Sequence, residues 1–393
     1  MRSSCLLVLI TLGCSGPPAS GLDAAVVDAA AADASRAVDA ASEIDAAPPP
    51  DATPPDAGRT CLGAEGPEIL AALGERADGA SLRIEGCRFG PKAEAAPRLY
   101  DRVDDQPAYA GLSVGDRIPT DGDAPWTVNH DNWSEFVRYA TDRPRPGRAA
   151  FYRVSGGSNG GDGALGWPRA LGGTSPPPEQ RLLYVSWWYR PSMDPGGGSP
   201  TSGSNKFIRV WDDPEFGGTK VSWTQMHLTY RSGAEHTAWR SWSRDGRVGE
   251  WNRMEITIDA DGGTVRHYVN NVQQRVSNST RGDFDIDDFE KHPDWAHLGL
   301  SVAVLGFDHG DNSYGEMVTD FGEIYIDTTR ARVEIGDAPT WGESRHRELQ
   351  LPTEWSDDAI VVQVGRGAFE ALAGQYLYVV DAEGRVNEDG FAL

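Results

Sequence analysis

The sequence predicts an all-β protein. Tryptophan, tyrosine, valine and isoleucine gather in short runs that glycine, asparagine, aspartate and proline interrupt, and no apolar period of helical length is sustained. Residues 221–230 alternate strictly, as a strand does, and residues 251–271 read as a hairpin closed by Asp-Gly-Gly. We therefore expect a large β-sandwich and a small β-domain, preceded by a disordered tether.

Residues 1–14, MRSSCLLVLITLGC, have the composition of an export signal, with one arginine and an apolar run too short to span a bilayer. The pair Gly13-Cys14 resembles the lipobox of bacterial lipoproteins. That family prefers leucine three residues before the cysteine, whereas here Thr11 holds the place and Leu12 follows. The resemblance implies export, acylation of Cys14 and lipid anchoring to the bacterial outer membrane or cell surface, with no other contact to the membrane.

Residues 15–58 consist almost entirely of alanine, aspartate, proline, serine and glycine. Such a stretch has too little apolar surface to offset the entropy lost on ordering, so we predict a disordered, self-repelling tether. A tether directly after a lipidated cysteine is what an anchored surface domain needs.

The chain carries a formal net charge of −23, of which residues 59–393 hold about −17. Nucleic acid is therefore excluded as a partner on electrostatic grounds. Residues 206–266 are locally neutral, with nine basic and nine acidic side chains. An anionic ligand is least repelled there.

Outside the signal, the cysteines are Cys61 and Cys87. An even pair in an exported chain favours a disulfide. The alternative, a metal site, lacks further cysteine or histidine at ligand spacing nearby.

Both ends of the folded part suggest a small domain, residues 59–97 with 331–393. The first end resembles the opening of IPT/TIG-type immunoglobulin-like domains, and the second resembles the closing half of the same type. The matching positions are Ile84, Gly86, Phe89 and Gly90 at one end, and Trp355, Ser356, Ile360, Val362 and Val364 at the other. The resemblance implies one immunoglobulin-like domain split by an insertion; two unrelated caps are the alternative.

The insertion, residues 98–330, is expected to hold the large domain. Strands are predicted at 149–154, 182–190, 205–211, 221–230, 237–243, 251–260, 264–271, 297–307 and 320–329. The order resembles concanavalin A-like jelly rolls, whose hairpin and late-strand positions match Gly249, Trp251, Glu255, Asp261-Gly262, Val269, Asn270, Tyr325 and Asp327. The resemblance implies the sandwich fold and no particular chemistry.

The predicted strand 221–230 sets Val221, Trp223, Gln225, His227 and Thr229 on one face. An indole, an amide and an imidazole in a row suit a groove in which an aromatic plate stacks on a sugar and polar groups bind its hydroxyls or carboxylate. The alternative is that Trp223 packs under a loop and that His227 is an ordinary, hydrogen-bonded histidine.

Gln225-Met226-His227 resembles the "Q–I–H" strand of alginate- and glucuronan-type polysaccharide lyases, and Lys206 matches the lysine that opens the preceding strand in some of them. Departures exist, because the "R–S/T–E–L" and "Y–F–K–x–G–x–Y" strands are missing and Phe207-Ile208-Arg209 replaces Leu-Pro-Gly after the lysine. The resemblance implies β-elimination on an acidic polysaccharide.

A lyase must neutralise a uronate carboxylate, remove the C5 proton and protonate the leaving oxygen. We assign the carboxylate to Arg209 and Gln225, the base to His227 and the acid to a tyrosine, with Tyr230 first and Tyr189 and Tyr314 as other candidates. Lys206 joins this catalytic set, and the predicted substrate-binding residues are Trp223, Trp211, Arg253, Glu255 and Tyr189. For Arg209 the alternative is a surface ion pair with Asp212 or Asp213.

Other functions stay open. The segment with Asp285, Asp287 and Glu290 resembles the paired-carboxylate strand of jelly-roll glucanases, which implies hydrolysis. Thirteen tryptophans also suit a non-catalytic glycan-binding or adhesive module. No cofactor is required, although the oxygens around 308–312 (Asp308, His309, Asp311 and Asn312) have the chemistry to hold a structural calcium. We expect a monomer.

Overall fold

The structure, a computed structural model, describes residues 61, 65–130, 135–155, 163–174, 178–195, 206–211, 219–224, 227–230, 235–238, 242–274, 276–278, 282–284, 299–308 and 316–393. The chain divides into two units, Met1–Pro54 and Pro55–Leu393, and every described residue belongs to the second. The predictions for the signal, for Cys14 and for the tether lie outside the described residues.

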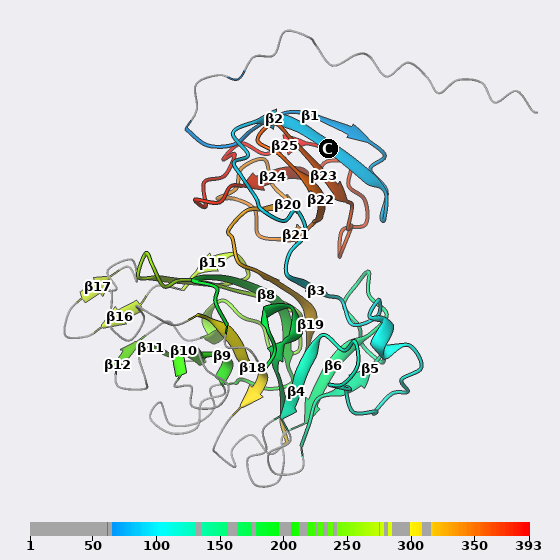
Figure 1. The fold of residues 1–393 in the computed structure, drawn as a ribbon, viewed down its shortest axis with the longest axis vertical. Coiled ribbons are helices and arrows are strands. Elements are labelled where there is room, and N and C mark those ends of the chain that lie inside the picture. Colours follow the sequence, from blue (N-terminus) through cyan, green and yellow to red (C-terminus); the bar gives the residue numbers. More distant parts are fainter. Residues whose placement is uncertain are drawn as a thin grey trace, which may run out of the picture. The chain divides into compact units, whose positions relative to one another are not determined.

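The described chain is built almost wholly of antiparallel strands, which confirms the all-β prediction (Figure 1). One sheet has seven strands in the order β12-β11-β10-β9-β18-β7-β4. Their bounds are β4 (Trp126–His130), β7 (Gly163–Pro168), β9 (Lys206–Trp211), β10 (Thr219–Thr224), β11 (His227–Tyr230), β12 (Glu235–Ala238) and β18 (Ser301–Asp308). Strand β9 lies at the centre of this sheet.

The facing sheet has eight strands, in the order β15-β14-β13-β8-β19-β6-β5, with β3 also paired to β19. Their bounds are β3 (Leu99–Asp101), β5 (Arg138–Ala140), β6 (Phe151–Ser155), β8 (Leu182–Pro191), β13 (Asn252–Asp259), β14 (Thr264–Val269), β15 (Val272–Gln273) and β19 (Val318–Asp327). The predicted 251–271 hairpin is confirmed as β13 and β14, in which Met254, Ile256 and Ile258 point into the core.

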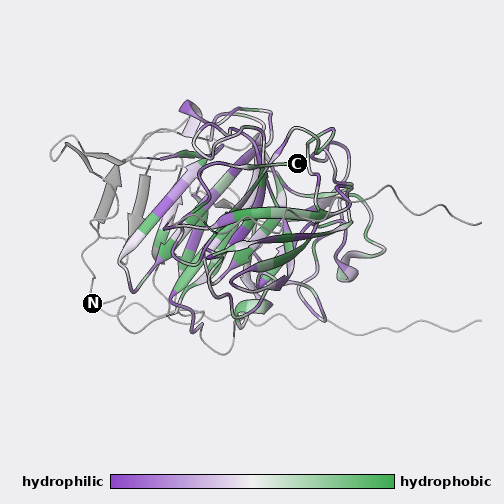
Figure 2. Cartoon of the chain, turned by 90° about the horizontal axis from the view of Figure 1, so that it is seen from above, coloured by the Kyte–Doolittle hydropathy of each residue, from purple (hydrophilic) through white to green (hydrophobic). Residues whose placement is uncertain are grey.

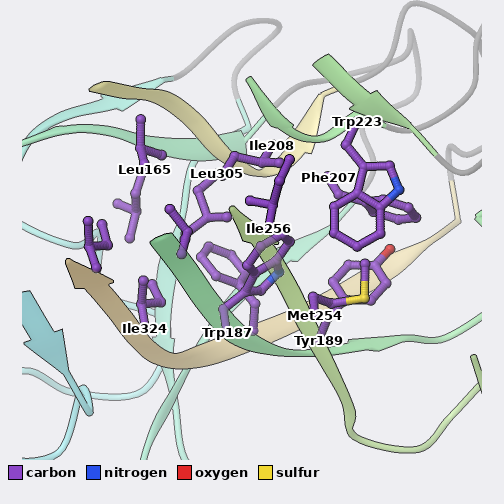
Figure 3. Packing of buried hydrophobic residues seen from close by; sticks show 14 of the residues in the cluster. Leu165, Trp187, Tyr189, Phe207, Ile208, Trp223, Met254, Ile256, Leu305 and Ile324 are labelled. Carbon is purple, nitrogen blue, oxygen red and sulfur yellow. The ribbon is translucent and has the colours of Figure 1, made fainter. Parts of the chain in front are cut away.

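The two sheets enclose one hydrophobic core (Figure 3). Trp187 and Tyr189 come from β8, Phe207 and Ile208 from β9, and Leu305 from β18. Aromatic rings meet edge to face in this core, with centroids 5.1 Å apart for Tyr189 and Phe207. Two sheets that face each other across such a core are the predicted jelly-roll sandwich. Apolar and polar stretches alternate along many of the strands (Figure 2).

The terminal segments build two four-stranded sheets, β1-β2-β23-β22 and β21-β20-β24-β25, which share a second core. Residues far apart in sequence meet here, since Leu82 pairs with Val362 (Figure 1). The predicted Cys61–Cys87 disulfide is confirmed, and it joins the chain before β1 to the last residue of β2. The bounds are β1 (Glu68–Gly74), β2 (Ser81–Cys87), β20 (Arg332–Gly336), β21 (Arg347–Leu349), β22 (Leu351–Trp355), β23 (Ala359–Gln363), β24 (Tyr376–Val380) and β25 (Phe391–Ala392). We call this part the terminal domain.

The remaining elements are short. A two-stranded sheet pairs β16 (Val276–Asn278) with β17 (Gly282–Phe284), and single 3-10 turns occur at Pro107–Tyr109, Arg169–Leu171 and Trp242–Arg244. Among the residues that the structure describes, no helix has the length and apolar character needed to cross a membrane.

Ion pairs connect the outer face of the eight-stranded sheet to the terminal domain. Arg145 is 3% exposed and donates to Glu323 of β19 and to Glu348 of β21. Its guanidinium carbon also lies 3.7 Å from the centre of the Trp188 ring. Although burial alone would raise it, the pKa of Glu323 falls to about 2 because Arg145 and Arg148 stabilise its charged form. We call Arg145, Arg148, Glu323 and Glu348 the Arg145 cluster.

Candidate glycan-binding face of the seven-stranded sheet

The central strand β9 separates core side chains from side chains on the other face of its sheet. Phe207, Ile208 and Val210 lie in the core, and a bulge in the pairing with β10 allows Phe207 and Ile208 to do so as neighbours. Arg209 pairs with Ser222 of β10 and with Val304 of β18. Because residues opposite each other point the same way, Arg209 shares its face with Val304, outside the core.

This outer face carries a small apolar cluster of its own. Ala164 and Trp167 come from β7 and Ala303 and Val304 from β18, and Trp211 of β9 packs on them while staying partly exposed. The Trp167 and Trp211 rings meet edge to face with centroids 6.2 Å apart. The face therefore presents the half-exposed Trp211 ring with Arg209 two residues before it on the same strand.

Close approach of two strands fixes this cluster. A Cβ on Gly166 of β7 would lie 2.1 Å from the carbonyl oxygen of Ala303 and 2.9 Å from His130 Nε2. His130 Nε2 itself lies 2.9 Å from that carbonyl oxygen. Only glycine permits this spacing, which seats Trp167 against β18.

Polar groups border the cluster on the β10 side. Ser222 and Thr224 follow the buried Val221 and Trp223 alternately, so their hydroxyls point away from the core. Lys206 pairs with Thr224, which brings the start of β9 beside these hydroxyls. Lys206 and Arg209 are both half-buried. Ser222 and Thr224 are only 6% and 3% exposed, so the guanidinium, ammonium and indole groups are the ones that match a ligand with a carboxylate and apolar sugar faces.

The prediction that Trp223 stacks on substrate is wrong. Trp223 is 3% exposed and lies in the core with Phe207 and Trp187 (Figure 3). Its ring also contacts His267. The expected single strand 221–230 is also wrong, because β10 ends at Thr224 and β11 begins at His227 as its antiparallel neighbour. Because β10 and β11 run antiparallel, one alternation cannot run through both Trp223 and His227.

Three further substrate-binding predictions fail for related reasons. Tyr189 is fully buried in the core beside Phe207 and Trp242. Arg253 and Glu255 lie on the eight-stranded sheet and are 2% and 3% exposed, respectively. Arg253 donates to Glu334 at 2.6 Å and to Glu255 at 3.0 Å. A chain bound on the β9 face does not reach them.

For several predicted site residues, the structure describes only the backbone or does not describe the residue. His227 begins β11, two strands from β9, and Tyr230 pairs with Val221. Outside the described residues lie Gln225, the side chains of His227, Tyr230 and Asp308, and the positions Asp285, Asp287, Glu290, His309, Asp311, Asn312 and Tyr314. Within the described ranges, no three of the histidine, cysteine, aspartate and glutamate side chains gather as metal ligands would.

Trp167 is a residue of this face that the sequence did not predict. The run Gly163–Pro168, GALGWP, is buried throughout, as a strand covered on both faces is. Its small residues and its lack of alternation gave no strand signal, yet the glycines were the available sign of close backbone approach.

Comparisons with known proteins give a fold-level likeness. No protein-family model matches the chain, and no curated protein matches it. Among solved structures, a cellulose-induced protein is 18% identical with a TM-score of 0.34, covering 49% of this chain and 85% of its own. A family-7 alginate lyase is 12% identical with a TM-score of 0.32, covering 48% and 82%. Domain 4 of an extracellular arabinanase from Geobacillus stearothermophilus is 13% identical with a TM-score of 0.26, covering 54% and 80%. With identities below 25% and TM-scores below 0.5, these likenesses assign the chain no activity.

Proposed function

We propose that the chain binds a uronate-containing polysaccharide on the outer face of the seven-stranded sheet and cleaves it by β-elimination. The observation that carries the proposal is the placement of Arg209 and Trp211 on the central strand, facing away from the core and beside Trp167. An arginine next to an accessible indole suits a sugar with a carboxylate, because the guanidinium binds the anion and the ring packs on the sugar.

In the proposed β-elimination, each proton and each broken bond is accounted for. Arg209 neutralises the uronate carboxylate, which makes the C5 proton more acidic. His227 takes that proton, the C4–O bond breaks, and a C4–C5 double bond forms in the new chain end while the leaving oxygen gains a proton from a general acid. Strands β9, β10 and β11 are consecutive neighbours, so Arg209 and the start of β11 belong to one sheet.

A panel of polyuronates and neutral polysaccharides tests this function. We expect polyuronates to bind and to generate ultraviolet absorbance from the conjugated product. Arg209→Gln should weaken binding about tenfold or more, since a charge-assisted hydrogen bond contributes about 1.5–3 kcal/mol. Arg83→Gln, which removes an exposed arginine on β2, is the matched control and should change nothing. His227→Ala should abolish the absorbance and leave binding largely intact.

Each other outcome points elsewhere. New reducing ends without absorbance would indicate hydrolysis and direct attention to Asp285, Asp287 and Glu290. Binding without any product would make the chain a glycan-binding surface module. If no glycan binds, the carbohydrate proposal fails.

We also propose that Cys14 is acylated and anchors the protein at the cell surface. Labelling with a fatty-acid analogue in a bacterial host should mark the wild-type chain and spare Cys14→Ala. Equal labelling of both chains would contradict the anchor.

A further inference from the structure

A second site lies on the other sheet. A cavity of about 170 Å³ opens between the outer face of the eight-stranded sheet and the terminal domain. Its walls include Tyr184, Glu255 and Tyr268 on one side and Arg332, Trp341 and Arg347 on the other. An engineered cavity of about 150 Å³ takes up one benzene molecule, so this volume suits a single six-membered ring.

The buried charges around this cavity do not cancel. Arg253, Arg332 and Arg347 surround Glu334, with nitrogen–oxygen distances of 2.6, 2.6 and 3.3 Å. Glu255, paired with Arg253 at 3.0 Å, is the only other carboxylate in this network of described residues. Arg330, also on the wall, is matched separately by Asp259 at 2.8 Å. Three guanidinium groups against two carboxylates leave one positive charge in excess.

The pKa of Arg347 is lowered, chiefly by burial and further by Arg253 and Arg332, while Glu334 and Glu255 oppose the shift. The pKa values of Arg253 and Arg332 are instead raised. Arg347 is 4% exposed, and its guanidinium carbon lies 3.6 Å from the centre of the Trp341 ring. An anion in the cavity would balance the network.

Glu255 indicates what else the ligand carries. Its Oε1 accepts hydrogen bonds from Tyr184 Oη at 2.8 Å and from Arg253 Nη2 at 3.0 Å. Its Oε2 is buried and has no hydrogen-bond partner among the described residues. A buried carboxylate oxygen without a donor is costly, and a ligand hydroxyl would supply one.

From these observations we propose that the cavity binds one ring of a sugar acid, with the carboxylate toward Arg347 and Arg332 and a hydroxyl donating to Glu255. Trp341 and Tyr268 supply aromatic walls for the ring. The ligand is a free sugar acid or the terminal residue of a polyuronate, since the volume admits a single ring. The site stands apart from the β9 face and does not depend on the proposed function.

Gly342 offers a sharp test. It lines the cavity and is exposed, and a Cβ there would meet nothing within 4 Å. Gly342→Glu adds a carboxylate to the wall, and Gly342→Gln adds a side chain of the same size without charge. Titration calorimetry on the full chain with D-glucuronate should show one site that Gly342→Glu weakens about tenfold or more and that Gly342→Gln largely retains. Glucose, which has the ring and no carboxylate, should bind at least tenfold more weakly.

Further measurements show whether the ligand is a free sugar acid or a chain end, and they distinguish this cavity from the β9 face. In the Arg209→Gln variant, oligoglucuronate binding that Gly342→Glu weakens, with no binding of free glucuronate, assigns the pocket to the chain end, and binding of both assigns it to sugar acids in general. Arg209→Gln should leave glucuronate binding unchanged, and Gly342→Glu should leave polysaccharide binding to the β9 face unchanged. The proposal is overturned if neither acid binds, if glucose binds equally well, or if both Gly342 variants behave alike.

Discussion

Replacing Arg145 with alanine should lower the free energy of unfolding by about 3–5 kcal/mol, because it leaves two buried carboxylates without their shared partner. Glu323 would keep Arg148 at 2.7 Å and Tyr100 Oη at 3.0 Å, while Glu348 would keep His346 at 2.6 Å. These remaining partners do not replace a guanidinium that touches both acids and stacks on Trp188. Urea denaturation followed by tryptophan fluorescence measures the change.

Arg143 provides the matched control. It lies two residues away, is exposed, and pairs only with Asp142 at 3.5 Å among the described residues. Arg143→Ala should therefore change stability by less than about 1 kcal/mol. Equal losses in the two variants would contradict the role assigned to the Arg145 cluster.

The dependence of the unfolding free energy on pH tests the Arg145 cluster independently. Because the pKa of Glu323 is lowered from 4.5 to about 2, its contribution is fully present above pH 4.5 and is lost as pH falls through about 2. Arg145→Ala removes the largest cause of this lowering. The variant should therefore lose less stability on acidification than the wild type does.

The second large effect is expected at Trp223. Trp223→Ala should cost about 3–5 kcal/mol, since it empties a site packed by Phe207, Trp187 and His267. Glycan binding by the folded fraction should be unchanged, because the ring does not reach the outer face of its sheet. Thermal unfolding and a binding assay on the same sample report the two quantities.

Trp211→Ala should show the opposite pattern. Trp211 is partly exposed on the outer face, so its loss should cost less stability and should weaken polysaccharide binding. If Trp223→Ala weakened binding while Trp211→Ala did not, the placement of the glycan on the β9 face would be wrong.

The fold class could be predicted from the sequence because strands and hairpins produce patterns among neighbouring residues. The 251–271 hairpin alternates apolar side chains and closes at Asp-Gly-Gly, and both features need only neighbouring residues. The disulfide likewise followed from counting cysteines in an exported chain.

The site was harder because a strand's period does not say which face is buried. On the adjacent strands β10 and β9, alternation alone leaves either face open to Trp223 and Arg209. The contact of Trp223 with Trp187 of the opposite sheet identifies the core side. The sequence between β10 and β11 contains no glycine or proline, so it gave no sign that one strand ends and an antiparallel one begins there. Arg253 pairs with Glu334, which lies 81 residues later in the chain. No local sequence pattern predicts a contact over that separation.

The Cys61–Cys87 bridge has a mechanical consequence. Strands β1 and β2 lie within the loop that it closes, and β1 is the edge of its sheet. Tension applied to the chain before Cys61 passes through the two sulfur atoms to Cys87 and continues from there, so neither strand carries load along its backbone. Without the bridge, the same pull would peel β1 from β2 one hydrogen-bonded pair at a time. The covalent link thus moves the point of mechanical attachment from a weak edge to the far end of β2, which is held on both sides by β1 and β23.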